Sequence, residues 1–80
     1  MPKLKILSGN EILKIFISLG FEIVNQKGSH VKIRRINNNN KETLLIPNHK
    51  QVDTGTTRAI VRQASKYIAS EILQKHFYAE

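Results

Sequence analysis

The chain has 80 residues, which is enough for one domain with a small hydrophobic core but too few for two separate cores. Thirteen Lys and Arg against six Asp and Glu give a net charge of +7, which favours nucleic acid, an anionic membrane or an acidic protein as the partner. The absence of cysteine excludes disulfides and thiolate metal sites, and no apolar run approaches the length of a membrane span, so we expect a cytoplasmic protein.

The first predicted helix runs from Ser8 to Leu19. Ser8 and Glu11 have the spacing of a capping box, in which each side chain accepts a hydrogen bond from the backbone of the other residue. Apolar residues then recur at helical spacing as far as Leu19. Gly20 follows, and we expect it to close the helix in a left-handed conformation.

Three short segments rich in strand-forming residues come next, at residues 21–25, 29–36 and 42–46. The Lys27-Gly28 pair predicts the turn between the first two. The run Asn37–Asn40 predicts a hairpin loop, because asparagine tolerates left-handed turn conformations. Pro47 ends the third strand, since it has no N–H for a ladder. The pattern predicts an antiparallel meander.

A polar connection over residues 48–54 leads to a second helix that opens at Gly55–Arg58 and carries apolar residues as far as Ile68. Its cap could be Asp53, Thr54 or Thr56. Ser65 or Ser70 could interrupt this helix, and a short terminal helix could restart at Ser70. The order α-β-β-β-α predicts an α+β domain with both helices on one face of a three-stranded antiparallel sheet. The side chains that we expect in its core are those of Phe16, Phe21, Ile23, Val31, Ile33 and Ile60.

The strand at residues 29–36 has the most informative pattern. Val31 and Ile33 alternate with Lys32 and Arg34, so one face is apolar and the other cationic. His30 falls on the cationic face. Such a face suits a polyanion, and an imidazole is the side chain that changes protonation near neutral pH.

Four stretches follow one another at a familiar spacing: Gly-Phe-Glu-Ile-Val at 20–24, Lys-Gly-Ser-His-Val at 27–31, Ile-Pro-Asn-His at 46–49 and Gly-Thr-Thr-Arg-Ala-Ile-Val-Arg-Gln-Ala at 55–64. Together they resemble HicA-type toxins, the small ribonucleases of bacterial toxin–antitoxin pairs. The resemblance covers Ser8 to about Ala64. It implies a single HicA-like domain over residues 1–80, a double-stranded-RNA-binding-domain-like fold, RNA cleavage by a histidine and inhibition by a HicB antitoxin. The family usually has a glycine after the position of Ala64, where this chain has Ser65-Lys66, so the end of the second helix is left open.

The resemblance assigns the catalytic histidine to His30 and the turn glycine to Gly28. Ser29 and His30 are adjacent on the predicted strand and point to opposite faces, so they are badly placed for a Ser–His relay, and we expect Ser29 to be a structural or phosphate-contacting hydroxyl. His49 could serve as general acid, bind phosphate or hydrogen-bond within its loop. A lysine or water could also be the acid. The residues that we expect to contact RNA are Lys27, Gly28, Ser29, Lys32, Arg34, Thr56 and Arg58.

Three functions remain open at this point. The leading one is a metal-independent endoribonuclease that cleaves messenger RNA with His30 as general base and is neutralised by a HicB-like antitoxin. No metal or other cofactor is expected, because two loop-separated histidines without a carboxylate or cysteine at ligand spacing make a poor zinc site. The second function is a non-catalytic RNA-binding module of the same fold. The third is an interaction protein whose basic face only docks an acidic partner.

Overall fold

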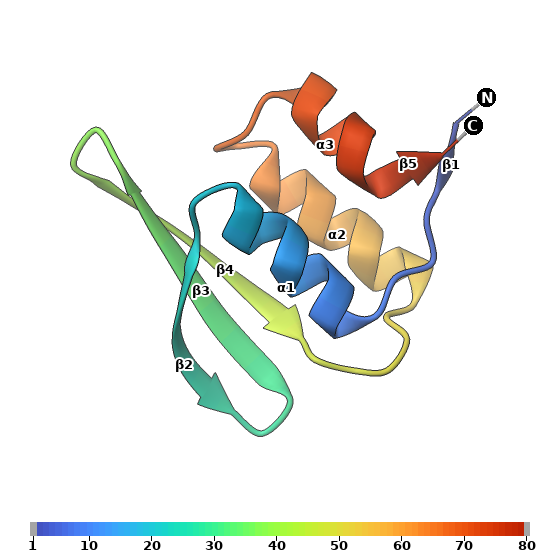
Figure 1. Ribbon diagram of the computed structural model, residues 1–80, viewed down its shortest axis with the longest axis horizontal. Coiled ribbons are helices and arrows are strands. Elements are labelled where there is room, and N and C mark those ends of the chain that lie inside the picture. Colours follow the sequence, from blue (N-terminus) through green and yellow to red (C-terminus); the bar gives the residue numbers. More distant parts are fainter. Residues whose placement is uncertain (1, 80) are drawn as a thin grey trace.

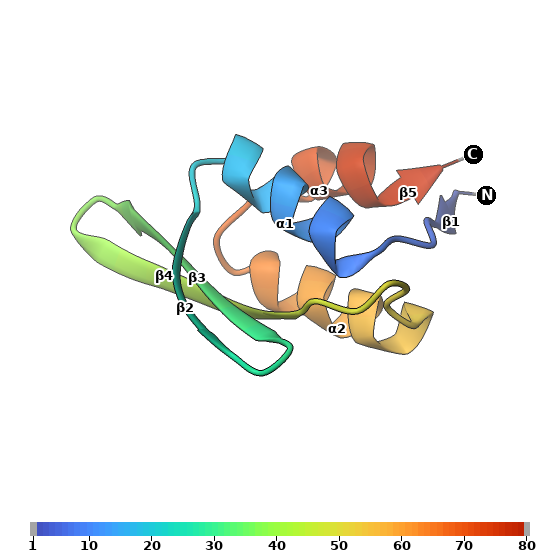
Figure 2. The same ribbon diagram turned by 60° about the horizontal axis from the view of Figure 1, so that its bottom comes forward.

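A three-stranded antiparallel sheet, covered on one face by helices, makes up most of the computed structural model, which describes residues 2–79 (Figures 1 and 2). The sheet order is β2-β3-β4. This confirms the predicted α+β fold with its double-stranded-RNA-binding-domain-like α-β-β-β-α core. In chain order the elements are β1 (Lys3–Leu4), α1 (Gly9–Ser18), β2 (Glu22–Lys27), β3 (His30–Asn37), β4 (Asn40–Pro47), α2 (Thr54–Ala64), α3 (Ser70–Phe77) and β5 (Tyr78–Ala79).

Local signals determine both ends of α1. The Ser8 side chain accepts from the Glu11 amide, and the Glu11 carboxylate accepts from the Ser8 amide at 2.8 Å, which confirms the capping box. At the other end Gly20 has a φ of +100°, its amide donates to the Ile17 carbonyl, and the Phe21 amide donates to the Phe16 carbonyl. This is a Schellman motif. It brings the rings of Phe16 and Phe21 edge to face, with centroids 5.5 Å apart.

Both hairpins have two-residue turns. Lys27 pairs with His30 across the first turn, where Gly28 has a φ of +60°, as in a type II′ turn. Asn37 pairs with Asn40 across the second, and the two residues between them have φ values of 52° and 66°, as in a type I′ turn. Strand β4, at 40–47, is longer than the predicted 42–46, because the asparagine run contributes to the ladder. Strand β2, at 22–27, is one residue longer than predicted, and β3, at 30–37, is shifted by one residue with its length unchanged, so that Ser29 lies in the turn.

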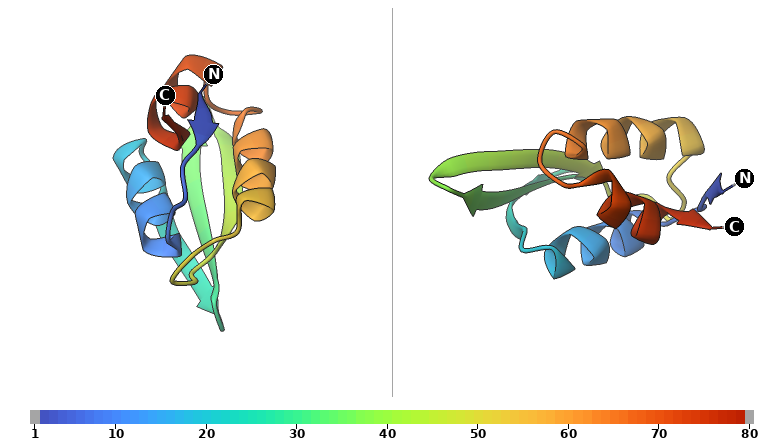
Figure 3. Two further views of the ribbon diagram at one scale, coloured as in Figure 1. Left: turned by 90° about the vertical axis from the view of Figure 1, so that its right-hand side faces the viewer. Right: turned by 90° about the horizontal axis from the view of Figure 1, so that it is seen from above.

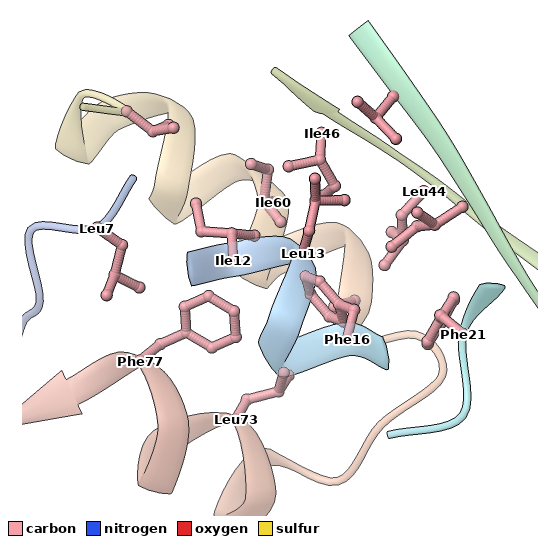
Figure 4. Packing of buried hydrophobic residues seen from close by; sticks show 14 of the residues in the cluster. Leu7, Ile12, Leu13, Phe16, Phe21, Leu44, Ile46, Ile60, Leu73 and Phe77 are labelled. Atoms are coloured by element: carbon pink, nitrogen blue, oxygen red, sulfur yellow. The ribbon is translucent and has the colours of Figure 1, made fainter. Parts of the chain in front are cut away.

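The core lies between the sheet and the helices (Figure 4). Five of the six predicted core residues, Phe16, Phe21, Val31, Ile33 and Ile60, are at most 5% exposed. The prediction for Ile23 was wrong, since its side chain is 53% exposed. It pairs with Ile33, on the covered side of the sheet, but β2 is an edge strand and all six of its residues are exposed. The helices pack on β4, and their cover does not extend to β2.

An ion pair between Arg35 and Glu42 lies on the same side of the sheet, beyond the apolar core. Arg35 donates to the Glu42 carboxylate at 2.6 Å, to the Leu19 carbonyl at 3.0 Å and to the Tyr67 carbonyl at 3.2 Å. Its guanidinium also lies 5.1 Å from the centre of the Phe21 ring. Arg35 therefore ties the end of α1, strand β4 and the α2–α3 connection together.

The C-terminal part of the chain departs most from the prediction. Helix α2 ends at Ala64, so Ile68, which we expected to lie on it, is buried in the connection to α3 instead. A terminal helix does begin at Ser70, and its Phe77 ring lies 5.6 Å from that of Phe16. Strands β1 and β5, which we did not predict, pair antiparallel and bring the two ends of the chain side by side (Figure 3). Within residues 2–79 no helix is long and apolar enough to cross a membrane.

Candidate functional site

The helices lie on one side of the sheet and leave its outer face uncovered (Figure 2). This outer face carries the predicted cationic residues in register. Side chains on this face form three rows across the strands β2, β3 and β4. The rows are Lys27–His30–Pro47, Asn25–Lys32–Leu45 and Glu22–Arg34–Thr43. His30, Lys32 and Lys27 are exposed, and Arg34 is partly covered. The sequence thus placed His30, Lys32 and Arg34 on one face correctly.

Residues of the first two rows line an open depression of about 430 Å³. It is lined by Asn25, Lys27, His30, Lys32 and Leu45. A volume of this size is within the range of small-ligand sites. The sequence reasoning identified three of these residues. It missed Asn25 and Leu45, which come next to His30 only through the register of the two hairpins.

The β2–β3 turn beside His30 is fixed by contacts from the rest of the chain. The Gln26 side-chain amide donates to the Gly28 carbonyl at 3.1 Å. The Asn48 amide donates to the Ser29 carbonyl at 2.6 Å, and Nε2 of His49 lies 3.3 Å from Oγ of Ser29. The His49 carbonyl in turn accepts from the Gly9 amide at the start of α1, at 2.8 Å.

The loop at residues 48–53 therefore joins the β2–β3 turn to helix α1. The side-chain contact of His49 is not the expected hydrogen bond within its own loop: it reaches Ser29 in the β2–β3 turn, next to His30. Ser29 is accordingly engaged on both its carbonyl and its hydroxyl. These contacts hold the residue that precedes His30 in a defined position.

Thr56 lies on the first turn of α2 and Arg58 follows at the start of the second, both outside the depression that contains His30. Asp53 caps this helix, which decides among the three predicted caps: its carboxylate accepts from the Thr56 amide at 2.9 Å and from the Thr56 hydroxyl at 2.8 Å. These bonds from the Thr56 backbone and hydroxyl hold the pKa of Asp53 below its usual value. The amino end of α2 thus already carries the carboxylate of Asp53, while the Arg58 side chain nearby is exposed.

Within residues 2–79 no three His, Asp or Glu side chains are grouped so that they could hold a metal ion. Asp53 is engaged at the α2 cap, and Glu22 lies on the third row, opposite Arg34. The groups around His30 are cations, an amide and apolar side chains. This set is suited to a phosphate-bearing ligand.

The fold and this face define a class: small α+β domains of the α-β-β-β-α arrangement that present a histidine among cations on the uncovered side of the sheet. A family model described as HicA toxin of bacterial toxin-antitoxin matches residues 9–65, which is well over half of the chain. The chain belongs to the HicA toxin family and is a toxin of a toxin–antitoxin system, with an antitoxin as its partner. The comparisons with curated proteins and with solved structures found no match.

Proposed function

We propose that this toxin is an endoribonuclease that cleaves messenger RNA without a metal ion, with His30 as the general base. The observation that carries the proposal is the position of His30: it is exposed on the outer face, between Lys27 on one neighbouring strand and Lys32 two residues along its own. No carboxylate lines the depression around it. A single imidazole among cations is a good arrangement for acid–base chemistry on a phosphodiester.

The reaction uses the substrate's own 2′-hydroxyl as the nucleophile. His30 removes the 2′-OH proton as the oxygen attacks phosphorus, and the bond from phosphorus to the 5′ oxygen breaks. In this proposal Lys27, the cross-strand partner of His30, gives a proton to the departing oxygen. The products are a 2′,3′-cyclic phosphate and a 5′-hydroxyl. Lys32 and Arg34 stabilise the negative charge on the phosphate oxygens.

The hydrogen bonds of Ser29 also support the proposal, because they fix the backbone just before His30. A general base must be held within hydrogen-bond reach of the proton that it removes. Ser29 is bonded to Asn48 and His49, so the chain enters β3 at His30 from a fixed point. In this role His49 positions the turn and takes no part in proton transfer.

Replacing His30 with alanine tests the mechanism. The side chain is exposed, so the free energy of unfolding should change by no more than about 0.5 kcal/mol. RNA affinity should be similar, because the cations remain. Cleavage should fall at least ~100-fold, the usual contribution of a positioned acid–base group. The wild-type protein should work in EDTA and leave a cyclic phosphate.

His76 provides a matched control, because it lies on α3, outside the lining of the depression. His76→Ala should cleave RNA at the wild-type rate. A substrate with a 2′-deoxy sugar at the cleaved position should bind and resist. If His30→Ala cleaves at the wild-type rate, or if the deoxy substrate is cut, the mechanism is wrong. If the wild type binds RNA and never cuts it, the domain is a non-catalytic RNA-binding module.

The antitoxin partner of this toxin, we further propose, is HicB-like and covers the outer face. Lys32 and Arg34 would be costly to bury without partners, so the covering surface should be acidic. Adding such an antitoxin should abolish cleavage at one equivalent, and charge reversal at Lys32 should weaken the complex more than charge reversal at Lys66, an exposed residue after α2. Full cleavage by the stoichiometric complex would refute this mode of inhibition.

A further inference from the structure

We propose that the depression beside His30 binds one nucleobase of the RNA, next to the cleaved bond, with Leu45 against the face of the base and Asn25 on its edge. This inference deepens the proposed ribonuclease function and rests on it. Asn25 and Leu45 become determinants of which base is accepted at that position.

The arrangement of the side-chain rows on the outer face supports a nucleobase in this depression. Asn25, Lys32 and Leu45 lie side by side across the three strands, one row away from Lys27, His30 and Pro47. Two residues along a strand span about 6.6 Å, so the centre of the second row lies one short step from His30. All three residues of the second row and His30 line the same depression. When the phosphate of the cleaved bond lies at His30, the base of the adjoining nucleotide therefore lies over the second row.

Leu45 supplies the apolar surface. Its neighbours along β4, Leu44 and Ile46, are buried under the helices, at most 2% exposed, whereas Leu45 is 52% exposed on the outer face. Leu45 stands directly opposite Lys32, so apolar surface and a cation lie side by side in this row. A base covers apolar area with its flat side, while Lys32 remains available to a phosphate.

Asn25 supplies the polar edge. Its amide offers a donor and an acceptor together, which is the pattern that base edges complement. The β2–β3 pairing shifts between Ile23 and Asn25, so β2 has a bulge at this point. The bulge keeps Ile23 opposite Ile33 on the covered side while Asn25 stands opposite Lys32 on the outer one. Bulges commonly re-aim a side chain next to a site.

The test is to cleave a pool of RNAs randomised in sequence and to read the bases that flank each cut. The wild type should prefer some bases over others at one flanking position. Asn25→Ala should reduce that preference by roughly 5- to 150-fold, the discrimination of a two-point amide contact, and should leave preferences elsewhere unchanged. Leu45→Ala should weaken binding of the same nucleotide. Thr43→Ala is the matched control, since Thr43 lies on the same strand and face as Leu45 but outside the depression. It should change neither the base preference nor the binding of that nucleotide.

A second measurement separates this inference from the proposed function. Short RNAs with a 2′-deoxy sugar at the cleaved position, differing in one base, should shift the NMR signal of the Asn25 side-chain amide to different extents. If the wild type cuts RNA but Asn25→Ala keeps the wild-type base preference, the nucleobase site is wrong and the ribonuclease stands. If nothing is cut while the amide shifts depend on the base, the nucleobase site stands and the catalytic proposal is wrong.

Discussion

Replacing Gly9 with alanine should show how strongly the loop before α2 is joined to α1. Gly9 is the first residue of α1, where alanine would ordinarily be preferred to glycine by up to about 1 kcal/mol. Here a Cβ would lie 2.5 Å from the Pro47 carbonyl oxygen and 2.5 Å from Cα of Asn48. Both are backbone atoms, so no side chain can move aside.

The helix has to separate from the loop to relieve this contact. Separation stretches the bond from the Gly9 amide to the His49 carbonyl, whose net contribution is about 0.5–1.5 kcal/mol. Over-packing of this kind usually costs about 1–3 kcal/mol, which exceeds the gain in helix propensity. We expect Gly9→Ala to lower the free energy of unfolding by about 1–3 kcal/mol, and Tm by several degrees for each kcal/mol.

Urea titration followed by circular dichroism measures this difference. Gly55→Ala is the matched control, because Gly55 is also in the first turn of a helix and its Cβ would meet no backbone atom, only Oδ1 of the Asp53 side chain, at 3.1 Å. The Gly55 variant should lose less than half as much stability. A Gly9→Ala protein as stable as the wild type would show that the loop yields freely and does not hold the β2–β3 turn.

Three further predictions concern the core, the cationic face and the cap of α2. Phe21→Ala should cost about 3–5 kcal/mol in urea titrations, because the ring is 2% exposed and packs on Phe16; a loss under 1 kcal/mol would contradict this. RNA affinity should fall steeply with salt, and Lys32→Ala should reduce the slope of log K against log salt by about 1, as should Arg58→Ala if α2 contacts phosphate. The lowered pKa of Asp53 means that its contribution to stability is present above the unfolded pKa, near 4, and disappears as the pH falls through the lower folded value. The stability advantage of the wild type over Asp53→Asn should therefore shrink as the pH falls below about 4, and an unchanged difference would contradict the cap assignment.

The sequence predicted α1 and the two hairpins well because their determinants are local. Ser8 and Glu11 start the helix, Gly20 ends it, and glycine or asparagine occupies each turn with positive φ. In the same way the alternation from His30 to Arg34 was enough to separate the two faces of β3. No long-range information was needed for any of these.

The failures come from contacts between distant parts of the chain. Ile23 has the right residue type and period for a core position, but whether it is covered depends on how far the helices extend over an edge strand. The pairing of β1 with β5 joins two-residue segments from opposite ends of the chain, and such short segments have no period to detect. Asn25 was missed for a related reason, since a bulge in β2 decides which face it joins.

The two faces of the sheet carry different groups of residues, and this has a consequence for the toxin. The residues that hold the fold together, including the Arg35–Glu42 pair, lie on the covered side, whereas His30, Lys32 and the depression that they line lie on the other. Substitutions on the outer face can therefore change cleavage or base preference while the core is unaffected. The link between the faces is the contact of Ser29 with Asn48 and His49, which ties the turn before His30 to α1. Damage to that link, as in Gly9→Ala, should lower activity and stability together, whereas His30→Ala should lower activity alone.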